Sequence, residues 1–345
     1  MTKWINGEGP LDDIVISSRI RLARNLEEYP FPIALTNEKS KEVIKKISDA
    51  IINGNTALKD DFSLIEIDKI SDNEKQVLIE KHLISPNLVE TPQKSAVLIN
   101  KDESVSIMIN EEDHLRIQCL FPGFQLDETW DLADKIDDIL EENIQYAFDE
   151  KIGYLTSCPT NVGTGIRASV MIHLPALTIT GYMDRILQAA NQIGLTVRGL
   201  YGEGTESEGN IYQISNQVTL GRAEEEIIDT LKEVTKQIMG KEHDARATLL
   251  ANNRIKLEDK ICRSFGILTN ARIIGSKEAL RLISDVRLGI DLGIIQNVDV
   301  KTINNLMIEI QAGVLQKIYG KSLSANERDI KRAKLIRKKL NLNKE

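Results

Sequence analysis

Residues 14–22 read IVISSRIRL, a strand-like stretch in which polar and apolar side chains alternate from Arg19 to Leu22. Alternation with a period of two is typical of a β-strand that buries one face and exposes the other. Arg19 and Arg21 are two residues apart, so both side chains project from the same face of this strand. The stretch therefore predicts a sheet that carries two guanidinium groups side by side.

Further strands are expected on both sides of this first one. Residues 96–100, 104–110 and 114–121 are short apolar runs separated by tight polar turns. Such spacing favours antiparallel meanders over βαβ crossovers, which need longer connections. Later in the chain we expect strands at residues 153–158, 168–174, 195–200 and 210–216.

Helical patterns occupy the intervals between these strands and most of the last third of the chain. Ser71 and Glu74 form a capping box, which predicts a helix that runs to about Lys81. Other helices are expected at residues 36–53, 127–148 and about 176–193. From about Arg222 the pattern is helical almost to the end, with breaks expected near Gly240, Gly266, Gly275, Gly289 and Gly320.

The order of these patterns predicts two domains. A chain of 345 residues with 41% hydrophobic content can bury a sizeable core, and its length suits two domains better than one. The composition shifts near residues 240–250. We therefore predict an α+β domain at residues 1–245 and an all-helical C-terminal domain at residues 246–345.

Composition narrows the class of protein. The net charge of −8 and the 4% aromatic content argue against direct nucleic-acid binding. Charged residues are frequent in the first thirty positions and no apolar run approaches membrane-spanning length, so neither a signal peptide nor a membrane span is expected. Three scattered cysteines do not make a disulfide framework or a zinc site. These features predict a cytoplasmic protein without a metal site of its own.

Arginines are the candidate device for binding phosphate. The chain has no Walker A sequence, no kinase HRD or DFG set, no GxSxG elbow and no HExxH motif. Besides Arg19 and Arg21, Arg116 lies on an expected strand, Arg167 follows the glycine-rich turn NVGTG, and Arg198 precedes GLYGEG. The planar guanidinium fork donates bidentate hydrogen bonds to phosphate oxygens. Any one of these arginines alone is more often an ordinary surface or salt-bridged residue.

Two carboxylates and a cysteine are candidates for the chemistry. Glu112 lies in the acidic run of residues 110–114, which would ordinarily be a solvated turn. Glu203, in YGEG, is a second carboxylate, and two carboxylates can orient a guanidinium group and accept its proton. Cys158 precedes the same NVGTG turn, where a thiolate could contact a bound cation. A free cysteine is more often a small buried hydrophobe.

Six blocks of sequence resemble the phosphagen (guanidino) kinases, the group of the creatine and arginine kinases. They occur in the family's order and together cover roughly residues 14–225: SSRIRLARN (17–25), HLISP (82–86), NEEDHLR (110–116), SCPTNVGTGIRASV (157–170), VRGLYGEGTES (197–207) and QISNQVTLG (213–221). The resemblance implies the phosphagen-kinase fold, an antiparallel sheet flanked by helices. It also implies ATP as the phosphoryl donor and Mg²⁺ held mainly by the nucleotide phosphates.

The resemblance also implies site residues at matching positions. Glu112 matches the family's catalytic carboxylate, Glu203 the guanidinium-binding carboxylate of arginine-specific members, and Cys158 the reactive cysteine. The implied nucleotide-binding positions are Ser18, Arg19, Ile20, Arg21, Leu22, His82, Arg116, Arg167, Ala168, Ser169, Val170, Met171, Arg198, Gly199, Leu200, Tyr201, Gly202 and Glu203.

Two departures from small-molecule phosphagen kinases make the chain similar to the bacterial protein arginine kinases (the McsB type). Those kinases carry a helical domain of about a hundred residues ahead of the SSRxR motif, whereas this motif starts here at residue 17. A helical region is instead expected after the catalytic domain. A site without that leading domain is expected to be open enough for an arginine side chain of a protein.

Similarity to the McsB type implies partners and a cellular role. The expected partners are protein substrates with exposed arginines, a zinc-binding activator protein, the Clp ATPase and protease machinery, and a transcriptional repressor of heat-shock genes. Homodimers and a role in the stress response are also implied, through repressor inactivation and tagging of proteins for degradation.

The segment RDIKRA (328–333) matches an element of the same subfamily, where it forms an allosteric phosphoarginine pocket. The implied pocket residues are Arg328, Asp329, Arg332 and Ala333. Arg328 and Arg332 are four residues apart, so on a helix they share a face and both could reach one phosphate. The local alternative is an ordinary basic helix end.

Three functions follow in order of preference. The leading hypothesis is ATP-dependent phosphorylation of arginine side chains in proteins. A kinase of free arginine or another small guanidine is the alternative in the same class. A catalytically silent phosphoarginine-binding adaptor is the alternative in another class, although it would not need both Glu112 and Glu203 together with five arginines.

Overall fold

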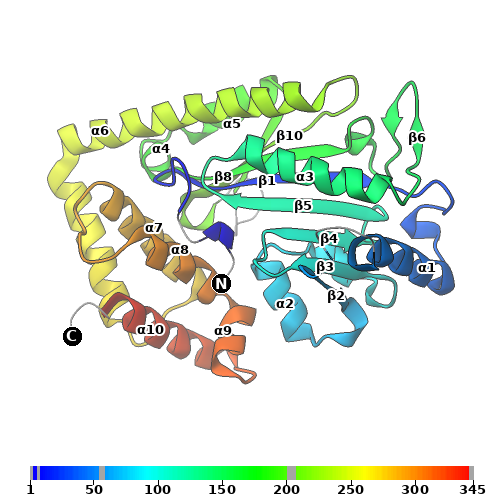
Figure 1. The fold of residues 1–345 in the computed structure, drawn as a ribbon. Coiled ribbons are helices and arrows are strands. Elements are labelled where there is room, and N and C mark those ends of the chain that lie inside the picture. Colours follow the sequence, from blue (N-terminus) through cyan, green and yellow to red (C-terminus); the bar gives the residue numbers. More distant parts are fainter. Residues whose placement is uncertain (1–2, 6–7, 54–58, 200–206, 342–345) are drawn as a thin grey trace.

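A computed structural model describes residues 3–5, 8–53, 59–199 and 207–341 of the chain. It has two parts: a large sheet with helices packed on it, and a group of helices at the C-terminal end (Figure 1). The long helix α6 (Glu224–Asn270) starts above the sheet and continues into the helical part. Among the described residues, no helix is both long and apolar enough to cross a membrane.

The sheet has eight strands, and every neighbouring pair is antiparallel, as the short connections predicted. The first strand along the chain lies near its middle, between strands from distant parts of the sequence. In spatial order the strands are β2 (Phe62–Glu66), β3 (Ala96–Asn100), β4 (Val105–Ile109), β5 (Leu115–Pro122), β1 (Val15–Arg24), β8 (Ile166–His173), β10 (Ile211–Asn216) and β9 (Leu195–Gly199).

The two faces of the central strands have different roles. On β1, Ile20 and Leu22 are fully buried in the main core, which lies under the acidic helix α3 (Leu126–Glu141). Side chains alternate between faces, so Arg19 and Arg21 project from the other side of the sheet. The pattern that predicted the strand thus also separates the core from a charged surface.

Several expected boundaries in the first two-thirds were wrong. The helix expected to reach 148 ends at Glu141, whereas the one expected at 36–53 is confirmed as α1 (Asn37–Ser48) continued by a π-helix at Asp49–Asn53. The strand expected at 153–158 is only the short β7 (Gly153–Tyr154), which pairs with β6 (Phe148–Asp149). By contrast, the capping box at Ser71 and Glu74 is confirmed at the start of α2 (Asp72–Glu80).

One expected helix is split by a glycine. The stretch 176–193 forms α4 (Pro175–Ile179) and α5 (Met183–Gln192). Gly181 lies between them with a φ of +73°, a conformation that L-residues other than glycine rarely adopt. The break lets the chain turn away from α4 before α5 covers β9 at the edge of the sheet.

The C-terminal region is helical, as expected, but its breaks differ from the prediction. It consists of the second half of α6 and of α7 (Ser276–Asp291), α8 (Val300–Glu309), α9 (Ala312–Tyr319) and α10 (Ala325–Asn341). Gly275 precedes α7 and Gly320 ends α9 in a left-handed conformation, which confirms two of the five breaks. Breaks at Gly240, Gly266 and Gly289 were wrong, because all three lie inside helices. Helix α6 runs through residues 245 and 246, and the domain division there stays a prediction.

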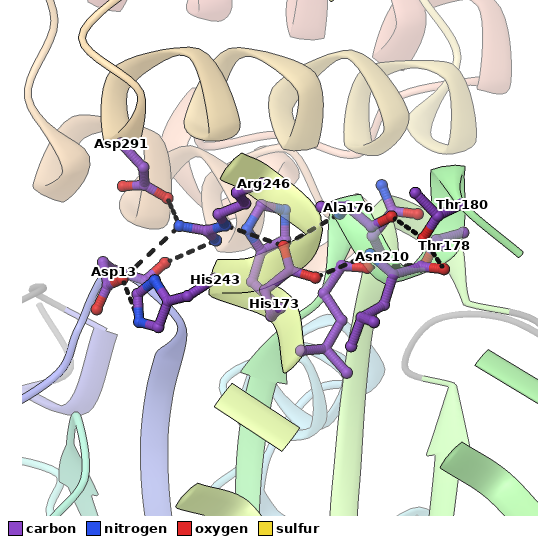
Figure 2. A network of polar contacts seen from close by, with 12 residues as sticks. Asp13, His173, Ala176, Thr178, Thr180, Asn210, His243, Arg246 and Asp291 are labelled. Carbon is purple, nitrogen blue, oxygen red and sulfur yellow. Dashed lines mark hydrogen bonds and ion pairs between the residues drawn. The ribbon is translucent and has the colours of Figure 1, made fainter. Parts of the chain in front are cut away.

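A buried polar network centred on Glu242 of α6 joins the two parts. Figure 2 shows Ala176, Arg246 and Asp291 of this network. The Glu242 carboxylate accepts hydrogen bonds from the backbone N–H groups of Ala176 (3.0 Å) and Leu177 (2.9 Å), and from Arg246 Nε (2.9 Å). Arg246 also lies 3.4 Å from a carboxylate oxygen of Asp291 on α7. Glu242 therefore connects α6 to the start of α4 and, through Arg246, to the helical region.

Replacing Glu242 by alanine is expected to destabilise the protein by about 3–5 kcal/mol, because it leaves buried N–H groups and the Arg246 charge without their acceptor. Glu258→Ala is the matched control on the same helix, since Glu258 pairs with Arg254 at an exposed i,i+4 position. Its removal should cost less than about 0.5 kcal/mol. Denaturant unfolding of both variants measures the difference, and equal losses would show that the network does not hold the two parts together.

Candidate active site

Strand register brings four of the five predicted arginines to one face of the sheet. Arg21 on β1 lies directly opposite Arg167 on β8, so the two side chains share a face. On its other side Arg21 is opposite Gln118 of β5, and Arg116 is two residues from Gln118. Because residues two apart on a strand share a face, Arg19 and Arg116 belong to the same surface.

The fifth arginine joins this surface across β10. Gln213 lies opposite Met171, which is on the same face of β8 as Arg167, and Arg198 of β9 lies opposite Gln213. Gln213 also accepts a hydrogen bond of 2.6 Å from Nη2 of Arg19. The register of five neighbouring strands therefore converges on one cationic site that no single strand could form.

These arginines line a cavity of about 360 Å³. Its walls also contain Glu112, Cys158 and Gly199 from the predicted set. Among the described residues, the lining is Arg19, Arg21, Ala23, Glu112, Arg116, Cys158, Thr160, Asn161, Gly165, Arg167, Arg198, Gly199 and Gln213. His82 lines an adjoining cavity of about 400 Å³, which shares Arg19 and Arg21 with the first.

Burial and mutual repulsion make the charged forms of these arginines less favourable. Burial and then the charges of Arg116 and Arg167 lower the pKa of Arg19 to about 10, and burial and neighbouring arginines hold the pKa of Arg21 well below its usual value. In the part of the chain that the structure describes, Nε of Arg21 and Nε of Arg167 are buried without a hydrogen-bond partner. Such a cluster favours a ligand with several negative charges.

The adjacent glutamates of the acidic turn have different environments. The Glu111 side chain is fully buried, lies 2.6 Å from Arg116 Nη1 and accepts a hydrogen bond of 2.5 Å from Ser85. The Glu112 side chain is 37% exposed and lies 3.4 Å from Arg116 Nη2. Glu111 therefore anchors an arginine, whereas Glu112 remains accessible from the cavity.

Asp113 and Asn25 hold the turn that carries Glu112 in place. The buried Asp113 carboxylate accepts hydrogen bonds of 2.7 Å from Asn25 Nδ2 and from the backbone N–H of Ser157. Asn25 in turn accepts a hydrogen bond of 2.9 Å from the backbone N–H of His114. The acidic turn, the end of β1 and the loop before Cys158 are thus joined, and Glu112 and Cys158 are held at one cavity.

Cys158 is half-buried at the wall of the cavity. Its Sγ lies 3.0 Å from Thr160 Oγ1, and a hydrogen bond with Cys158 lowers the pKa of Glu112. Thr156 Oγ1 donates to the Cys158 carbonyl at 2.8 Å and supports the loop. The thiol is therefore beside the predicted base.

Burial is the largest influence on Glu112 and raises its pKa, with further contributions from Asp113 and Glu111, while Arg116 lowers it. A protonated Glu112 cannot accept a proton, so kcat/KM should fall as pH decreases through this raised pKa. We expect the acid limb of the pH–rate profile to lie above the ordinary glutamate value of about 4.3. Rates measured from pH 4.5 to 8, with folding monitored by circular dichroism, test this. A limb at or below the ordinary value would contradict it.

Other predicted site residues are placed as follows. Ser18, Ile20, Leu22, Ala168, Ser169, Val170 and Met171 are buried strand residues that flank the arginines and shape β1 and β8. Leu200, Tyr201, Gly202 and Glu203 lie outside the described residues, so the second carboxylate stays a prediction. Sequence reasoning missed Glu111 and Gln213, although each lies inside a block that it singled out.

The C-terminal motif lies on α10. Arg332 is 3% exposed and donates to the backbone carbonyls of Ile310 and Ile274, each at 2.9 Å, and to the Asp329 carboxylate. Arg328 is half-buried and donates to the Leu323 carbonyl at 2.9 Å. In this conformation Arg332 ties α10 to its neighbours, and Arg328 is the more accessible of the two cations.

The arrangement suits transfer of a phosphoryl group to a cationic acceptor. Cations for the phosphates surround one carboxylate that can hold a guanidinium and accept its proton. Within the described ranges no group of three or more histidine, cysteine or acidic side chains is placed to hold a metal ion.

Comparisons with known proteins agree with this geometry. Residues 42–245 match the family described as ATP:guanido phosphotransferase, C-terminal catalytic domain, and residues 254–345 match the protein-arginine kinase McsB C-terminal domain. The chain is 55% identical over 339 residues to the protein-arginine kinase of Brevibacillus brevis, covering 98% of this chain and 95% of that one. It is also 55% identical over 329 residues to that of Caldanaerobacter subterraneus, covering 95% and 97%.

Solved structures of phosphagen kinases share the fold. Lombricine kinase aligns with a TM-score of 0.61 and 26% identity, over 70% of each chain. The duplicated taurocyamine kinase from Schistosoma mansoni, with bound transition state analog components, aligns with a TM-score of 0.60 and 26% identity, over 72% of this chain and 36% of that one.

Proposed function

Since the chain belongs to the ATP:guanido phosphotransferase family, we propose that it transfers the γ-phosphoryl group of ATP to arginine side chains of proteins. It also carries the C-terminal domain of the protein-arginine kinases. The observation that carries the proposal is the convergence of five arginines and Glu112 on one cavity.

The arginines and the glutamate of the cavity have different roles in the proposed reaction. Arg19, Arg21 and their three neighbours bind and neutralise phosphate oxygens, on which charge is spread during transfer. Glu112 accepts a hydrogen bond from the acceptor guanidinium and then takes its proton. As the nitrogen–phosphorus bond forms, the bond between the γ-phosphorus and the leaving ADP breaks. A guanidinium has a pKa of about 12.5 or higher, so this proton must be removed for the nitrogen to attack.

ATP fits this set of side chains because its triphosphate is the kind of polyanion that a cluster of five guanidinium groups favours. Among the described residues, Arg116 is the member of this cluster that carboxylates already pair with. Mg²⁺ would arrive with the nucleotide phosphates and would share their charge with the arginines. This assignment needs no protein ligand for the metal.

The decisive experiment incubates the protein with ATP, Mg²⁺ and either free arginine or an unfolded protein. Acid-labile phosphate on the protein substrate, with none on free arginine, is the expected result. Phosphorylation of free arginine alone would favour a small-guanidine kinase. Failure on both substrates, with phosphoarginine peptides still bound, would favour a silent adaptor.

The cellular part of the proposal is supported only by resemblance to the McsB type. We propose a cytoplasmic homodimer that acts in the stress response. Its proposed partners are a zinc-binding activator, the Clp ATPase and protease machinery, and a repressor of heat-shock genes. Sedimentation of the purified protein tests the dimer, since a single species at the monomer mass would contradict it.

An allosteric phosphoarginine pocket at Arg328, Asp329, Arg332 and Ala333 also remains a proposal. Arg328→Ala is the sharper variant than Arg332→Ala, because Arg332 holds buried carbonyls and its loss would disturb the packing of α10. We expect Arg328→Ala to keep ATP binding but lose stimulation by phosphoarginine peptides, a coupling of about 1–3 kcal/mol. The assay follows phosphorylation of an unrelated protein with and without such a peptide. Equal stimulation of variant and wild type would place the pocket elsewhere.

A further inference from the structure

A second groove adjoins the arginine cavity at Glu112. It has a volume of about 540 Å³, and Glu112 lines both this groove and the arginine cavity. One wall is apolar, formed by Phe31, Pro32, Ile33 and Leu35. We propose that this groove binds the stretch of substrate polypeptide that flanks the acceptor arginine, an inference that rests on the proposed function.

Continuity with the catalytic carboxylate is the first argument. A guanidinium held by Glu112 points its reacting nitrogen toward the arginine cavity, where phosphate is expected. The groove also reaches Glu112, so it offers the rest of the substrate a place next to the held guanidinium. A free small guanidine would not need contacts there, whereas a polypeptide extends in both directions from its arginine.

Charge is the second argument. Among the described residues, Glu90 and Glu112 line the groove against one lysine, Lys94. Glu111 also lines it, but its side chain is buried and paired with Arg116. The Lys94 Nζ donates to the Leu35 carbonyl at 2.5 Å and is held at the wall. The groove is therefore acidic beside a strongly cationic cavity, which favours the basic end of an arginine and disfavours a second anion.

Ile33 supplies the apolar contact. Its side chain is 96% exposed, on a 3₁₀ turn (Pro32–Ala34), and lines the same groove as Glu112. A lone exposed isoleucine elsewhere would need no explanation, but here it stands at the edge of the path to the active site. An apolar residue next to the acceptor arginine of the substrate would cover the Ile33 side chain.

The turn that carries Ile33 is rigidly tied to the catalytic turn. His114 Nδ1 accepts a hydrogen bond of 3.1 Å from the backbone N–H of Leu26, so its Nε2 carries the proton and donates to the Pro30 carbonyl at 3.0 Å. His114 is the last residue of the run 110–114 that contains Glu112. The groove wall and the base are thus fixed relative to each other, as a specificity site requires.

The test compares two peptides, each with one arginine, flanked either by leucines or by serines. Wild type should prefer the leucine-flanked peptide by about 3- to 10-fold in kcat/KM, since a groove covers a side chain only in part. Ile33→Ser should remove this preference through KM, with nucleotide affinity unchanged. Ile255→Ser is the matched control, because Ile255 is 82% exposed on α6 and far along the chain from the site.

The outcomes separate the groove from the chemistry. If wild type phosphorylates both peptides equally, or if Ile33→Ser keeps the preference, the groove does not bind substrate. If Ile33→Ser instead changes the sedimentation of the protein and leaves peptide preference intact, the groove is an interface between copies, and the inference is overturned. Absence of phosphoarginine on every peptide with wild type would overturn the proposed function itself.

Discussion

Glu112→Gln is expected to lower turnover on a protein substrate by about 10²- to 10⁴-fold, the usual contribution of a general base. The substitution keeps the size of the side chain and one carbonyl oxygen, but it removes the negative charge and the proton acceptor. Glu112 lies 3.4 Å from Arg116, and Glu111 holds the same arginine at 2.6 Å. The arginine cluster should therefore persist, and ATP affinity should change little.

Glu111→Gln is the matched control from the neighbouring position. Because Glu111 is buried and paired with Arg116, its loss should weaken nucleotide binding more than it slows turnover at saturating ATP. Calorimetry gives the affinities, and steady-state rates at saturating ATP give kcat. Near-normal turnover in Glu112→Gln would mean that another group, such as the predicted Glu203, takes the proton.

The strands were predictable where two signals agreed. Residues 96–100 were expected as a strand and form β3, because an apolar run and polar turns on both sides point to the same element. Helix breaks were less predictable, since glycine costs only about 1 kcal/mol inside a helix and packing can offset that cost. At Gly289 a Cβ atom would lie 2.4 Å from Ile261 Cγ2, so this glycine lets α7 approach α6 closely.

The site could be predicted residue by residue but not as an arrangement. The spacing of Arg19 and Arg21 gives a shared face on one strand, whereas the opposition of Arg21 and Arg167 depends on register between strands distant in sequence. Likewise, the different roles of Glu111 and Glu112 depend on the turn, in which Asn110 has a φ of +57°. Periodicity carries no information about such a turn.

Arg21→Met is expected to have opposite effects on activity and on stability. Turnover should fall by about 10³-fold or more, because an arginine that contacts the transferring phosphoryl group contributes on that scale. The ligand-free protein should become more stable, by on the order of 1 kcal/mol after allowance for screening in an open cavity. Burial and the neighbouring arginines keep the pKa of Arg21 well below its usual value, so folding disfavours its charged form. That penalty is fully present at every pH below the lowered pKa and disappears as the pH rises toward the usual pKa of an arginine.

Arg24→Met on the same strand is the control that makes this contrast informative. Arg24 is 2% exposed, and its Nε and Nη2 donate to Asp137 at 3.0 and 2.7 Å. Its removal leaves a buried carboxylate unpaired and should destabilise the protein by about 3–5 kcal/mol. Thermal unfolding without nucleotide should therefore move in opposite directions for the two variants, and ATP should stabilise Arg21→Met less than wild type. If both variants are destabilised alike, hydrogen-bond acceptors of the protein stabilise Arg21 in the ligand-free state. The arginine cluster then does not lower the stability of the ligand-free protein in order to bind an anion.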